Sequence, residues 1–273
     1  MSETAKTAWI TGASSGIGAA LARAYAGRGY RVILSGRNEG ALAEIAAQCG
    51  TEHLILPFDT SDFAAAQAAA DTAWDWSGGI DVLVNNAGIS QRSLAVDTDF
   101  SVYQKMIDID LLGPIALTQA LLKRMVSRKT GQIVMISSLA GKVGSPLRSA
   151  YCAAKHGLIG YADSLRVELS PHGISVIGVT PGSIRTDVSR NAITADGGRR
   201  GVSDEAIDTG IDPDEFAARM LAAIDEGQRE VAIAEHGLEQ WIAQERRTPE
   251  DLFDKMIAAF NSGYAAKMGV SEQ

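Results

Sequence analysis

The stretch Thr11-Gly12-Ala13-Ser14-Ser15-Gly16-Ile17-Gly18 follows a short apolar run, Ala8–Thr11, and leads into an alanine-rich segment, Ile17–Gly27. Glycines in such a turn let the backbone approach a pyrophosphate closely, and the free N–H groups at the start of a helix attract its charge. The spacing G-x-x-x-G-x-G differs from the common G-x-G-x-x-G, and a glycine turn can also be only a tight connection. Its place in the first β-α unit favours a dinucleotide site.

The alternation of strand-like and helix-like segments continues along most of the chain. Runs rich in valine and isoleucine predict buried strands at Ala8–Thr11, Arg31–Ser35, His53–Leu56, Val82–Val84, Ile133–Ser137, Ser175–Thr180 and, at an edge, Val231–Ala234. Helices are predicted between them at Ile17–Gly27, Glu39–Gln48, Asp62–Trp76, Asp99–Ser127 and Ala150–Ser170. This order predicts an α/β fold, a doubly wound Rossmann-type parallel sheet of about seven strands with helices on both faces. Because we find no repeat and no linker, residues 1–273 are predicted to form a single domain.

The segment 187–212 breaks the alternation, because it is polar and rich in glycine. Long irregular loops in compact domains are usually lids or binding loops, or else disordered, and we interpret this one as a substrate lid. Residues 213–273 are predicted to add the edge strand and C-terminal helices near Pro213–Glu226, Leu238–Glu245 and Pro249–Asn261.

Composition and charge exclude several classes of function. The net charge is -8 and basic residues cluster only in short pairs, so nucleic acid is not an expected partner. The polar start leaves no room for a signal peptide and no apolar stretch reaches membrane-spanning length, so we expect a cytoplasmic protein without a membrane anchor. Cys49 and Cys152 are the only cysteines, and no His/Cys cluster predicts a metal site.

The sequence Tyr151-Cys-Ala-Ala-Lys155 puts a phenol and an ammonium group on one helix face. Carbonyl reduction needs a proton donor besides a hydride, and a neighbouring ammonium favours the phenolate form of a tyrosine. Ser138, at the end of an apolar strand, is suited to hold the substrate oxygen in place. By itself, Tyr-x-x-x-Lys equally describes an aromatic–lysine contact on a surface helix.

The end of the second predicted strand, Leu34-Ser35-Gly36-Arg37, bears on the choice of dinucleotide. An acidic residue there would bind the ribose hydroxyl of NAD, whereas an arginine accommodates the additional phosphate of NADP. Gly36 stands where the acid is expected and Arg37 follows it, so NADP(H) is favoured. NAD(H) stays possible, because Arg37 can also be a solvated loop cation and Ser15 adds no second basic residue.

Together these motifs resemble the short-chain dehydrogenase/reductase superfamily, in its single-domain branch. The matching landmarks are Thr11-Gly-x-x-x-Gly16-x-Gly18, Asp59, Asn85-Asn86-Ala87-Gly88, Ser138, Tyr151-x-x-x-Lys155 and Pro181-Gly182. Finer features resemble the dehydrogenase/reductase member 7 type, namely Asn86-Ala-Gly-Ile-Ser-Gln-Arg-Ser93, Arg148-Ser-Ala-Tyr151 and Ser189-Arg-Asn-Ala-Ile-Thr-Ala-Asp-Gly197. The resemblance implies an NADP(H)-dependent oxidoreductase that interconverts a ketone or aldehyde and an alcohol by hydride transfer.

The resemblance also implies a role for each matching residue. Tyr151 would be the proton donor or acceptor, Ser138 would orient the carbonyl, and Lys155 would bind the nicotinamide ribose and favour the ionised tyrosine. The implied cofactor-binding set is Gly12, Ser14, Ser15, Gly16, Ile17, Gly18, Arg37, Asp59, Asn86, Ala87, Gly88, Tyr151, Lys155, Pro181, Gly182, Ile184 and Thr186.

The chain departs from the family pattern at Asp110, which we include in the catalytic set. The family places an asparagine there, which supports a water molecule linked to the lysine. An aspartate loses the amide donor, and a buried charge is costly unless it is paired. Lys155 is the expected partner, and pairing would hold it more firmly charged. Full activity, a shifted pH optimum and weakened turnover all stay open.

The substrate is expected to be a small lipophilic or aromatic ketone, aldehyde or secondary alcohol. No arginine clamp for a carboxylate is obvious beyond Arg148, Arg185 and Arg190. The positions expected to line the pocket are Ser90, Gln91, Leu139, Ala140, Val143, Leu147, Ser183 and parts of Val188–Gly210.

The resemblance further implies a homodimer or homotetramer packed through Asp99–Ser127 and Ala150–Ser170. These segments carry apolar residues for an interface, although core packing explains them equally well: Leu117, Leu121, Leu158 and Leu165. Two other functions stay open, an NAD-dependent alcohol dehydrogenase and a non-catalytic dinucleotide-binding regulatory protein.

Overall fold

The strands pair in an order that reverses at the centre of the sheet. A computed structural model of the chain describes residues 5–235, 254, 258 and 261–262, and within them seven parallel strands lie in the order β3-β2-β1-β4-β5-β6-β7. They are β1 (Thr7–Thr11), β2 (Arg31–Ser35), β3 (His53–Ile55), β4 (Val82–Asn85), β5 (Gly131–Ile136), β6 (Ile174–Pro181) and β7 (Glu230–Ile233). The predicted doubly wound α/β fold is confirmed, and every predicted strand is present.

The reversal lies between β1 and β4. Trp9 in the middle of β1 stands opposite Ile33 of β2 on one side and Leu83 of β4 on the other. In open α/β sheets such a reversal leaves a crevice at the carboxyl ends of the strands, where ligands bind. The glycine turn that follows β1 therefore begins at this crevice.

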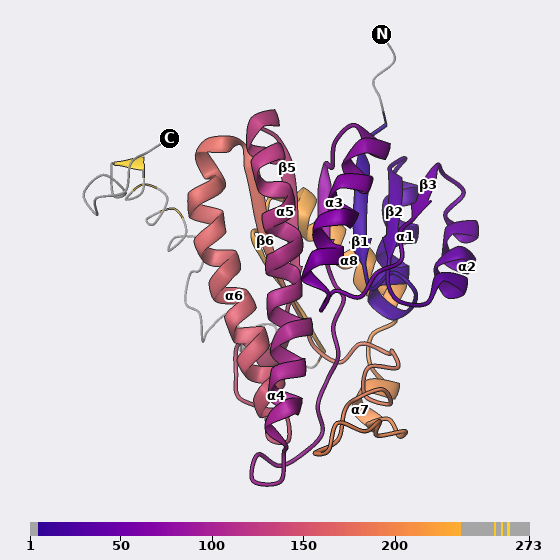
Figure 1. The fold of residues 1–273 in the computed structure, drawn as a ribbon, viewed down its shortest axis with the longest axis vertical. Helices are drawn as coiled ribbons and strands as arrows, with labels where there is room; N and C mark the ends of the chain where they lie inside the picture. Colours follow the sequence, from indigo (N-terminus) through magenta and orange to yellow (C-terminus); the bar gives the residue numbers. More distant parts are fainter. Residues whose placement is uncertain (1–4, 236–253, 255–257, 259–260, 263–273) are drawn as a thin grey trace.

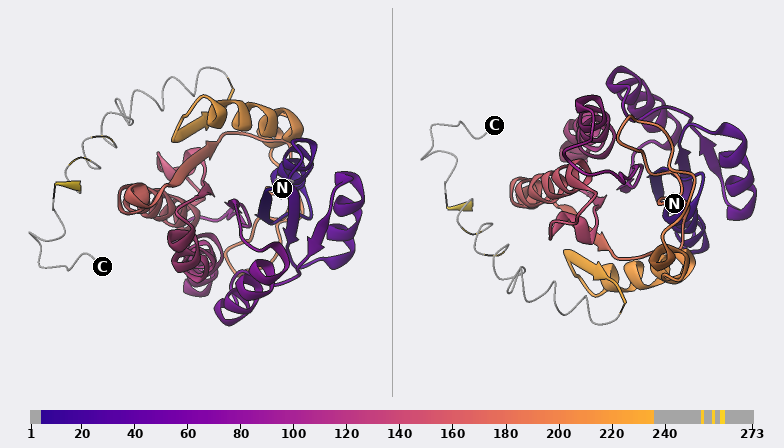
Figure 2. Two further views of the ribbon diagram at one scale, coloured as in Figure 1. Left: turned by 90° about the horizontal axis from the view of Figure 1, so that it is seen from above. Right: turned by 90° about the horizontal axis from the view of Figure 1, so that it is seen from below.

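Helices cover both faces of the sheet (Figures 1 and 2). They are α1 (Gly16–Gly27), α2 (Glu39–Cys49), α3 (Phe63–Ser77), α4 (Phe100–Ile107), α5 (Gly113–Arg128), α6 (Ser149–Leu169), α7 (Glu205–Asp208) and α8 (Pro213–Asp225). Buried side chains of α1, α2 and α8 pack on one face, and those of α3, α5 and α6 on the other. The labels of α4 and α7 stand at the lower end of Figure 1, where the strands end.

The leucines that were expected to supply an interface between subunits lie in the core of the chain itself. Leu117, Leu121, Leu158 and Leu165 are at most 4% exposed and pack against the sheet in the cluster formed by α3, α5 and α6. Each contributes about 1.5–3 kcal/mol by its burial. Of the two roles considered for these leucines, core packing is the one that the structure shows, because the apolar stripe of each helix is used within the fold.

The segment predicted as one helix over Asp99–Ser127 consists of two helices joined by the π-helical turn η1, Asp108–Leu112. Pro114 has no backbone N–H, so it cannot make the ordinary helical bond to the carbonyl of Asp110. The N–H of Gly113 bonds to the carbonyl of Asp108, which is the wider spacing of a π-turn. Such turns are frequent at functional sites, and this one contains the fully buried Asp110.

The predicted lid, residues 187–212, contains only the short helix α7 and isolated bridges, one of which pairs Ile193 with Gln91. After it, α8 ends one residue before the predicted Pro213–Glu226. The predicted helices Leu238–Glu245 and Pro249–Asn261 lie outside the continuously described residues 5–235.

Candidate active site

A cavity of about 610 Å³ runs along the carboxyl ends of the central strands. Its wall is formed by the segments that follow β1, β2, β3, β4, β5 and β6, together with residues of α4, α6 and the segment 187–212. All predicted catalytic and cofactor-binding residues line it, with the exception of Gly18. The fold thus brings together positions as distant in the sequence as Gly12 and Thr186.

The glycine turn after β1 is packed directly against the turn after β4. Gly12 has a left-handed φ of +66°, and a Cβ atom there would lie 2.9 Å from Ala87 Cα. Thr11 Oγ1 accepts hydrogen bonds of 3.0 Å from the N–H groups of Asn86 and Ala87. Gly18 packs against the same turn, because a Cβ atom on Gly18 would come within 2.1 Å of the Gly12 carbonyl oxygen. A turn this close to its neighbour, at the start of α1, fits the pyrophosphate of a dinucleotide.

A basic and an acidic side chain face each other where the cavity passes β2 and β3. Arg37 Nη1 lies 3.8 Å from Asp59 Oδ2, and the two side chains are 68% and 40% exposed. Burial alone would raise the pKa of Asp59, but hydrogen bonds from Ser61 and the charges of Arg37 and Lys105 bring it below its ordinary value. An exposed pair of this kind is weak, so Arg37 stays available to an anion.

Lys105 also lines the cavity, and the sequence interpretation missed it. Lys105 belongs to α4, and it is close enough to Asp59 for its charge to act on that carboxylate. No motif marks Lys105, because only the packing of α4 across the end of the sheet brings it to the cavity. Arg37 and Lys105 together give this part of the wall an excess of positive charge.

Ser138, Tyr151 and Lys155 line the part of the cavity formed by β5 and α6. Ser138 lies two residues after the end of β5, and its hydroxyl accepts the N–H of Ala140 at 3.2 Å, capping the short helix η2, Leu139–Gly141. Lys155 Nζ lies 5.7 Å from the centre of the Tyr151 ring, as expected for residues one helical turn apart. A local turn therefore holds the serine, and one helix holds the other two.

Lys155 is buried and faces the carboxylate of Asp110. Its Nζ lies 3.2 Å from Asp110 Oδ2 and donates a hydrogen bond of 3.2 Å to the carbonyl of Ile136. The other oxygen of Asp110 accepts the N–H of Ile89 at 2.9 Å. The structure thus joins Asp110 and Lys155 directly, as a buried ion pair at the floor of the cavity.

Burial and mutual attraction act in opposite directions on this pair. Burial raises the pKa of Asp110 above its ordinary value, although Lys155 and the N–H of Ile89 oppose the shift. Burial alone would lower the pKa of Lys155, but Asp110 and Tyr151 outweigh it and the net shift is upward. Asp110 is the main cause that raises the pKa of Lys155 and so favours its charged form.

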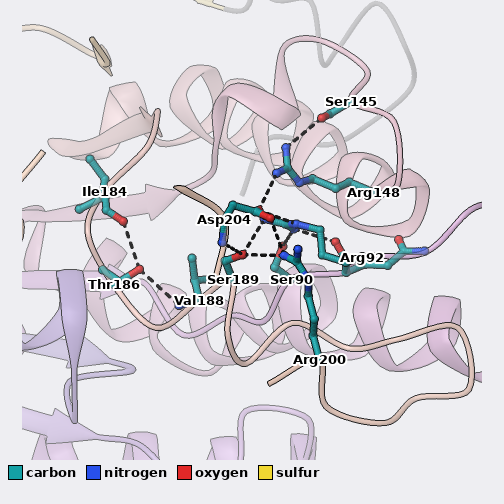
Figure 3. A network of polar contacts seen from close by, with 11 residues as sticks. Ser90, Arg92, Ser145, Arg148, Ile184, Thr186, Val188, Ser189, Arg200 and Asp204 are labelled. Atoms are coloured by element: carbon teal, nitrogen blue, oxygen red, sulfur yellow. Dashed lines mark hydrogen bonds and ion pairs between the residues drawn. The ribbon is translucent and has the colours of Figure 1, made fainter. Parts of the chain in front are cut away.

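The turn after β6 supplies another side of the cavity, through Pro181, Gly182, Ile184 and Thr186. The Thr186 hydroxyl donates to the carbonyl of Ile184 at 3.3 Å and accepts the N–H of Val188 at 3.4 Å (Figure 3). The turn is thus held by its own side chain as the chain enters the segment 187–212.

The wall of the cavity includes parts of Val188–Gly210 but omits most of the other positions predicted for the substrate pocket. Among the described residues, seven of the predicted positions lie outside the wall of the cavity: Ser90, Gln91, Leu139, Ala140, Val143, Leu147 and Ser183. Gln91 is fully buried, and its side chain bonds to Ser93 and to the backbone of Ala150. The segment 187–212 contributes Val188, Ile193 and Ile207 to the apolar part of the wall.

The fold and this site define an oxidoreductase of the Rossmann type, and sequence comparison gives its family. The family model described as short chain dehydrogenase matches residues 6–196. The chain belongs to the short-chain dehydrogenase/reductase family.

Within the family the chain is similar to the member 7 type. It is 40% identical over 261 residues to dehydrogenase/reductase SDR family member 7B of Xenopus tropicalis, covering 91% of this chain and 84% of the relative. It is 38% identical over 196 residues to dehydrogenase/reductase SDR family member 7 of Homo sapiens, covering 69% of this chain and 58% of the relative. The resemblance inferred from the motifs is confirmed.

Solved structures show the same architecture. A short-chain dehydrogenase from Streptomyces avermitilis aligns with a TM-score of 0.79 at 29% identity, covering 99% of this chain and 100% of its own. A short-chain dehydrogenase from Sphingobium yanoikuyae in complex with NADPH aligns with a TM-score of 0.77 at 28% identity, covering 91% and 96%. Within the described part of this chain, no helix is both long and apolar enough to cross a membrane.

Proposed function

We propose that the protein is an NADP(H)-dependent oxidoreductase that interconverts a ketone or aldehyde and the corresponding alcohol. One observation carries the proposal, namely that Ser138, Tyr151 and Lys155 line the same cavity as the glycine turn after β1. A dinucleotide held by that turn would reach along the cavity toward the three side chains. Binding and chemistry would then share one continuous site.

Tyr151 is the proton donor in the reductive direction and the proton acceptor in the oxidative direction. The chemistry that a bound nicotinamide dinucleotide supplies is hydride transfer to or from the substrate carbon. Ser138 holds the carbonyl oxygen toward the Tyr151 hydroxyl. Lys155, kept charged by Asp110, stabilises the phenolate that remains after the proton has moved.

The preference for NADP(H) rests on Arg37 and Lys105, which give their part of the cavity wall more positive than negative charge. An arginine matches the geometry of a phosphate and binds it with charge-assisted hydrogen bonds. Two related structures support the preference, because the Sphingobium yanoikuyae dehydrogenase and an actinorhodin polyketide ketoreductase mutant were each solved with NADPH.

A lipophilic substrate is supported by Val188, Ile193 and Ile207 in the wall of the cavity. The three arginines considered as a clamp for a carboxylate are each paired with an aspartate, in the pairs Arg148–Asp204, Arg185–Asp212 and Arg190–Asp187. Each of these guanidinium groups therefore already faces a negative charge.

The first experiment is a titration of the purified protein with NADPH and with NADH, followed by the fluorescence of the reduced nicotinamide. We expect NADPH to bind at least about tenfold more tightly, because a phosphate adds charge-assisted hydrogen bonds. Equal or tighter binding of NADH would favour the NAD-dependent alcohol dehydrogenase. Failure to bind either dinucleotide would contradict the proposed function.

The second experiment measures turnover of a panel of carbonyl compounds with the unaltered protein and with Tyr151→Phe. The panel contains aliphatic and aromatic ketones and one ketone that carries a carboxylate, because Arg199 also lines the cavity. The variant should lose about 10²–10⁴-fold in kcat while it keeps its affinity for NADPH. Saturable binding of NADPH without turnover that depends on Tyr151 would favour the regulatory protein.

A further inference from the structure

One carboxylate, that of Asp204, ties the segment 187–212 to the rest of the protein (Figure 3). Its Oδ2 accepts hydrogen bonds from Nε and Nη2 of Arg92, at 2.8 and 2.6 Å. The same oxygen lies 3.4 Å from Arg148 Nη2, and Oδ1 accepts from Arg200 Nη1 at 2.5 Å. Three guanidinium groups thus converge on one aspartate. We call Asp204 and these three arginines the Asp204 clamp.

The three arginines come from three separate stretches of the chain. Arg92 lies in the loop after β4, and Arg200 lies within the segment 187–212. Arg148 lies directly before α6, the helix that carries Tyr151 and Lys155. The clamp therefore connects the segment over the cavity both to the loop after β4 and to the start of the helix with the proposed catalytic residues.

Arg92 depends on Asp204 for its counter-charge. Its side chain is only 8% exposed, and Asp204 is the sole acidic partner it has among the described residues. Its Nη1 donates to Ser90 Oγ at 2.8 Å and to the Gln91 carbonyl at 2.7 Å, but these acceptors carry no charge. Burial lowers the pKa of Arg92, and Asp204 opposes this shift. A buried cation held in this way is costly to leave alone.

Asp204 is correspondingly held in its ionised form. Burial alone would raise its pKa, but hydrogen bonds from Arg200, Arg92 and Ser189 hold the pKa of this carboxyl well below its usual range. Ser189 is fully buried, and its hydroxyl oxygen accepts from Arg200 Nη1 at 3.0 Å and from the N–H of Asp204 at 3.1 Å. The clamp therefore joins two distant points of the segment as well as its surroundings.

The loop that carries Arg92 contacts both the segment and α6. The N–H of Ile193 donates to the Ser90 carbonyl at 2.8 Å, and the N–H of Arg92 donates back to the Ile193 carbonyl at 2.9 Å. The side chain of Gln91 points the other way, and its Oε1 accepts the N–H of Ala150 at 2.9 Å. Ala150 directly precedes the proposed proton donor, so one short loop locates the apolar cavity wall relative to it.

The turn before α6 has a strained backbone at Leu147, next to the arginine that reaches Asp204. Leu147 has φ +66°, a left-handed conformation that a leucine rarely adopts. The N–H of Ser93 donates to the Leu147 carbonyl at 3.0 Å, and Arg148 Nη1 donates to Ser145 Oγ at 3.0 Å. Such a conformation persists only where the surroundings impose it, and here it precedes the arginine that reaches Asp204.

We propose that Asp204 is a positioning residue, which through its clamp holds the segment 187–212 closed over the cavity and in place relative to the start of α6. Without the carboxylate, three guanidinium groups remain together with only neutral acceptors among the described residues, and their repulsion moves the segment away. The effect on substrate binding rests on the proposed function. The effect on the segment itself does not, so the two are tested separately.

The first test compares Asp204→Asn with Asp208→Asn by hydrogen–deuterium exchange of the cofactor-free protein. Asp208 is exposed and carries the same charge in the same segment, but its side chain is not part of the clamp. In Asp204→Asn the amides of residues 187–204 should exchange about tenfold faster, because a local opening becomes more favourable. Asp208→Asn should match the unaltered protein. Equal exchange in the two variants would overturn the proposal, whatever reaction the protein catalyses.

The second test is the division of the kinetic effect between KM and kcat, with a turned-over ketone and saturating NADPH. Asp204→Asn should raise KM about tenfold and change kcat less than about threefold, because the variant leaves Ser138, Tyr151 and Lys155 in place. A fall in kcat at unchanged KM would overturn the positioning role. Absence of turnover in the unaltered protein would contradict the proposed function and leave the exchange result to decide the clamp.

Two further variants guard against a folding defect. Asp204→Glu keeps the charge and should stay within about threefold of the unaltered protein in exchange and in KM, as expected if the charge is what matters. The double variant Arg92→Gln, Asp204→Asn removes a cation together with the carboxylate. Its KM should rise less than the product of the two single effects, because one uncompensated charge is gone. Additive effects would overturn the clamp.

Discussion

Two carboxylates in this protein hold positive charge in place, and they do so in different ways. Asp110 is fully buried and faces one ammonium group, that of Lys155, at 3.2 Å. The side chain of Asp204 is 24% exposed and faces three guanidinium groups, the nearest at 2.5 and 2.6 Å. One pair lies at the floor of the cavity, and the other group lies where the segment 187–212 meets its surroundings.

The difference shows what a carboxylate can control when its partner is a lysine and when its partners are arginines. A lysine can lose its proton when it is buried, so the carboxylate beside Lys155 decides whether that group is charged. An arginine stays charged and directs several donors in one plane, so a carboxylate among arginines fixes geometry. Asp110 therefore acts on protonation, and Asp204 acts on the position of a segment.

The largest effect is expected when the buried pair is broken by Asp110→Ala. The free energy of unfolding should fall by about 3–5 kcal/mol, because Lys155 remains buried without its counter-charge. Urea unfolding followed by tryptophan fluorescence measures the change. The double variant Asp110→Ala, Lys155→Met should recover most of the loss, since it leaves no charge behind. A loss below about 1 kcal/mol in the single variant would place the pair among weak ion pairs.

An exposed pair, Arg37 with Asp59, sharpens the comparison because neither partner is buried. Arg37→Gln should weaken binding of NADPH about 10–100-fold and leave binding of NADH unchanged, because the charged contact to the phosphate is lost. Stability should change by less than about 0.5 kcal/mol. The fluorescence titration and urea unfolding provide both numbers. Equal weakening of NADPH and NADH would show that Arg37 does not distinguish the two.

The pH dependence of the reduction rate separates the two carboxylates. The pKa of Lys155 is raised above its ordinary value of 10.5. The stabilising effect of the charged lysine is therefore complete below pH 10.5 and is lost as the pH rises through the raised pKa. Asp110→Asn removes the cause of the rise, and burial then lowers the pKa of Lys155. The alkaline limb of kcat/KM should move to lower pH. Asp204→Asn serves as the control, and an equal shift there would contradict the division of roles.

The smallest effect is expected for the clamp near neutrality. The pKa of Asp204 is depressed below its ordinary value of 3.8. The stabilising effect of the ionised carboxylate is therefore complete above pH 3.8 and is lost as the pH falls through the depressed pKa of the folded protein. Exchange of residues 187–204, corrected for the intrinsic rate, should vary less than about twofold between about pH 5 and pH 8. Exchange should rise only in acid below 3.8. An opening near pH 6 would point to a different titrating group.

Much of the site was predictable because its motifs are local. The glycine turn after β1 and the Tyr151/Lys155 pair depend on spacing within one turn or one helix, and the structure places both at the cavity. The pairing of Asp110 with Lys155 was expected from charge. The π-turn that contains Asp110 was not, although Pro114 is the residue that prevents regular helical bonding there.

The sequence was less informative where a side chain had several possible partners. Gln91 was expected in the substrate pocket, but it is fully buried, and its side chain bonds to Ser93 and to the N–H of Ala150 in α6. Leu117 and Leu158 suited an interface and the core equally well, and they lie in the core because their helices need that face to cover the sheet. An apolar or polar residue type does not indicate by itself which neighbour it meets.

The sequence alone determined the order of strands and helices along the chain, the place of the glycine turn and the spacing of the proposed catalytic residues. These depend on backbone geometry and on apolar periodicity, which are properties of neighbouring residues. Only the tertiary structure decided that Lys105 reaches the cofactor cavity and that Arg92 meets Asp204 across 112 positions. Contacts over such distances form only when packed helices and loops bring their ends together, and no local pattern encodes them.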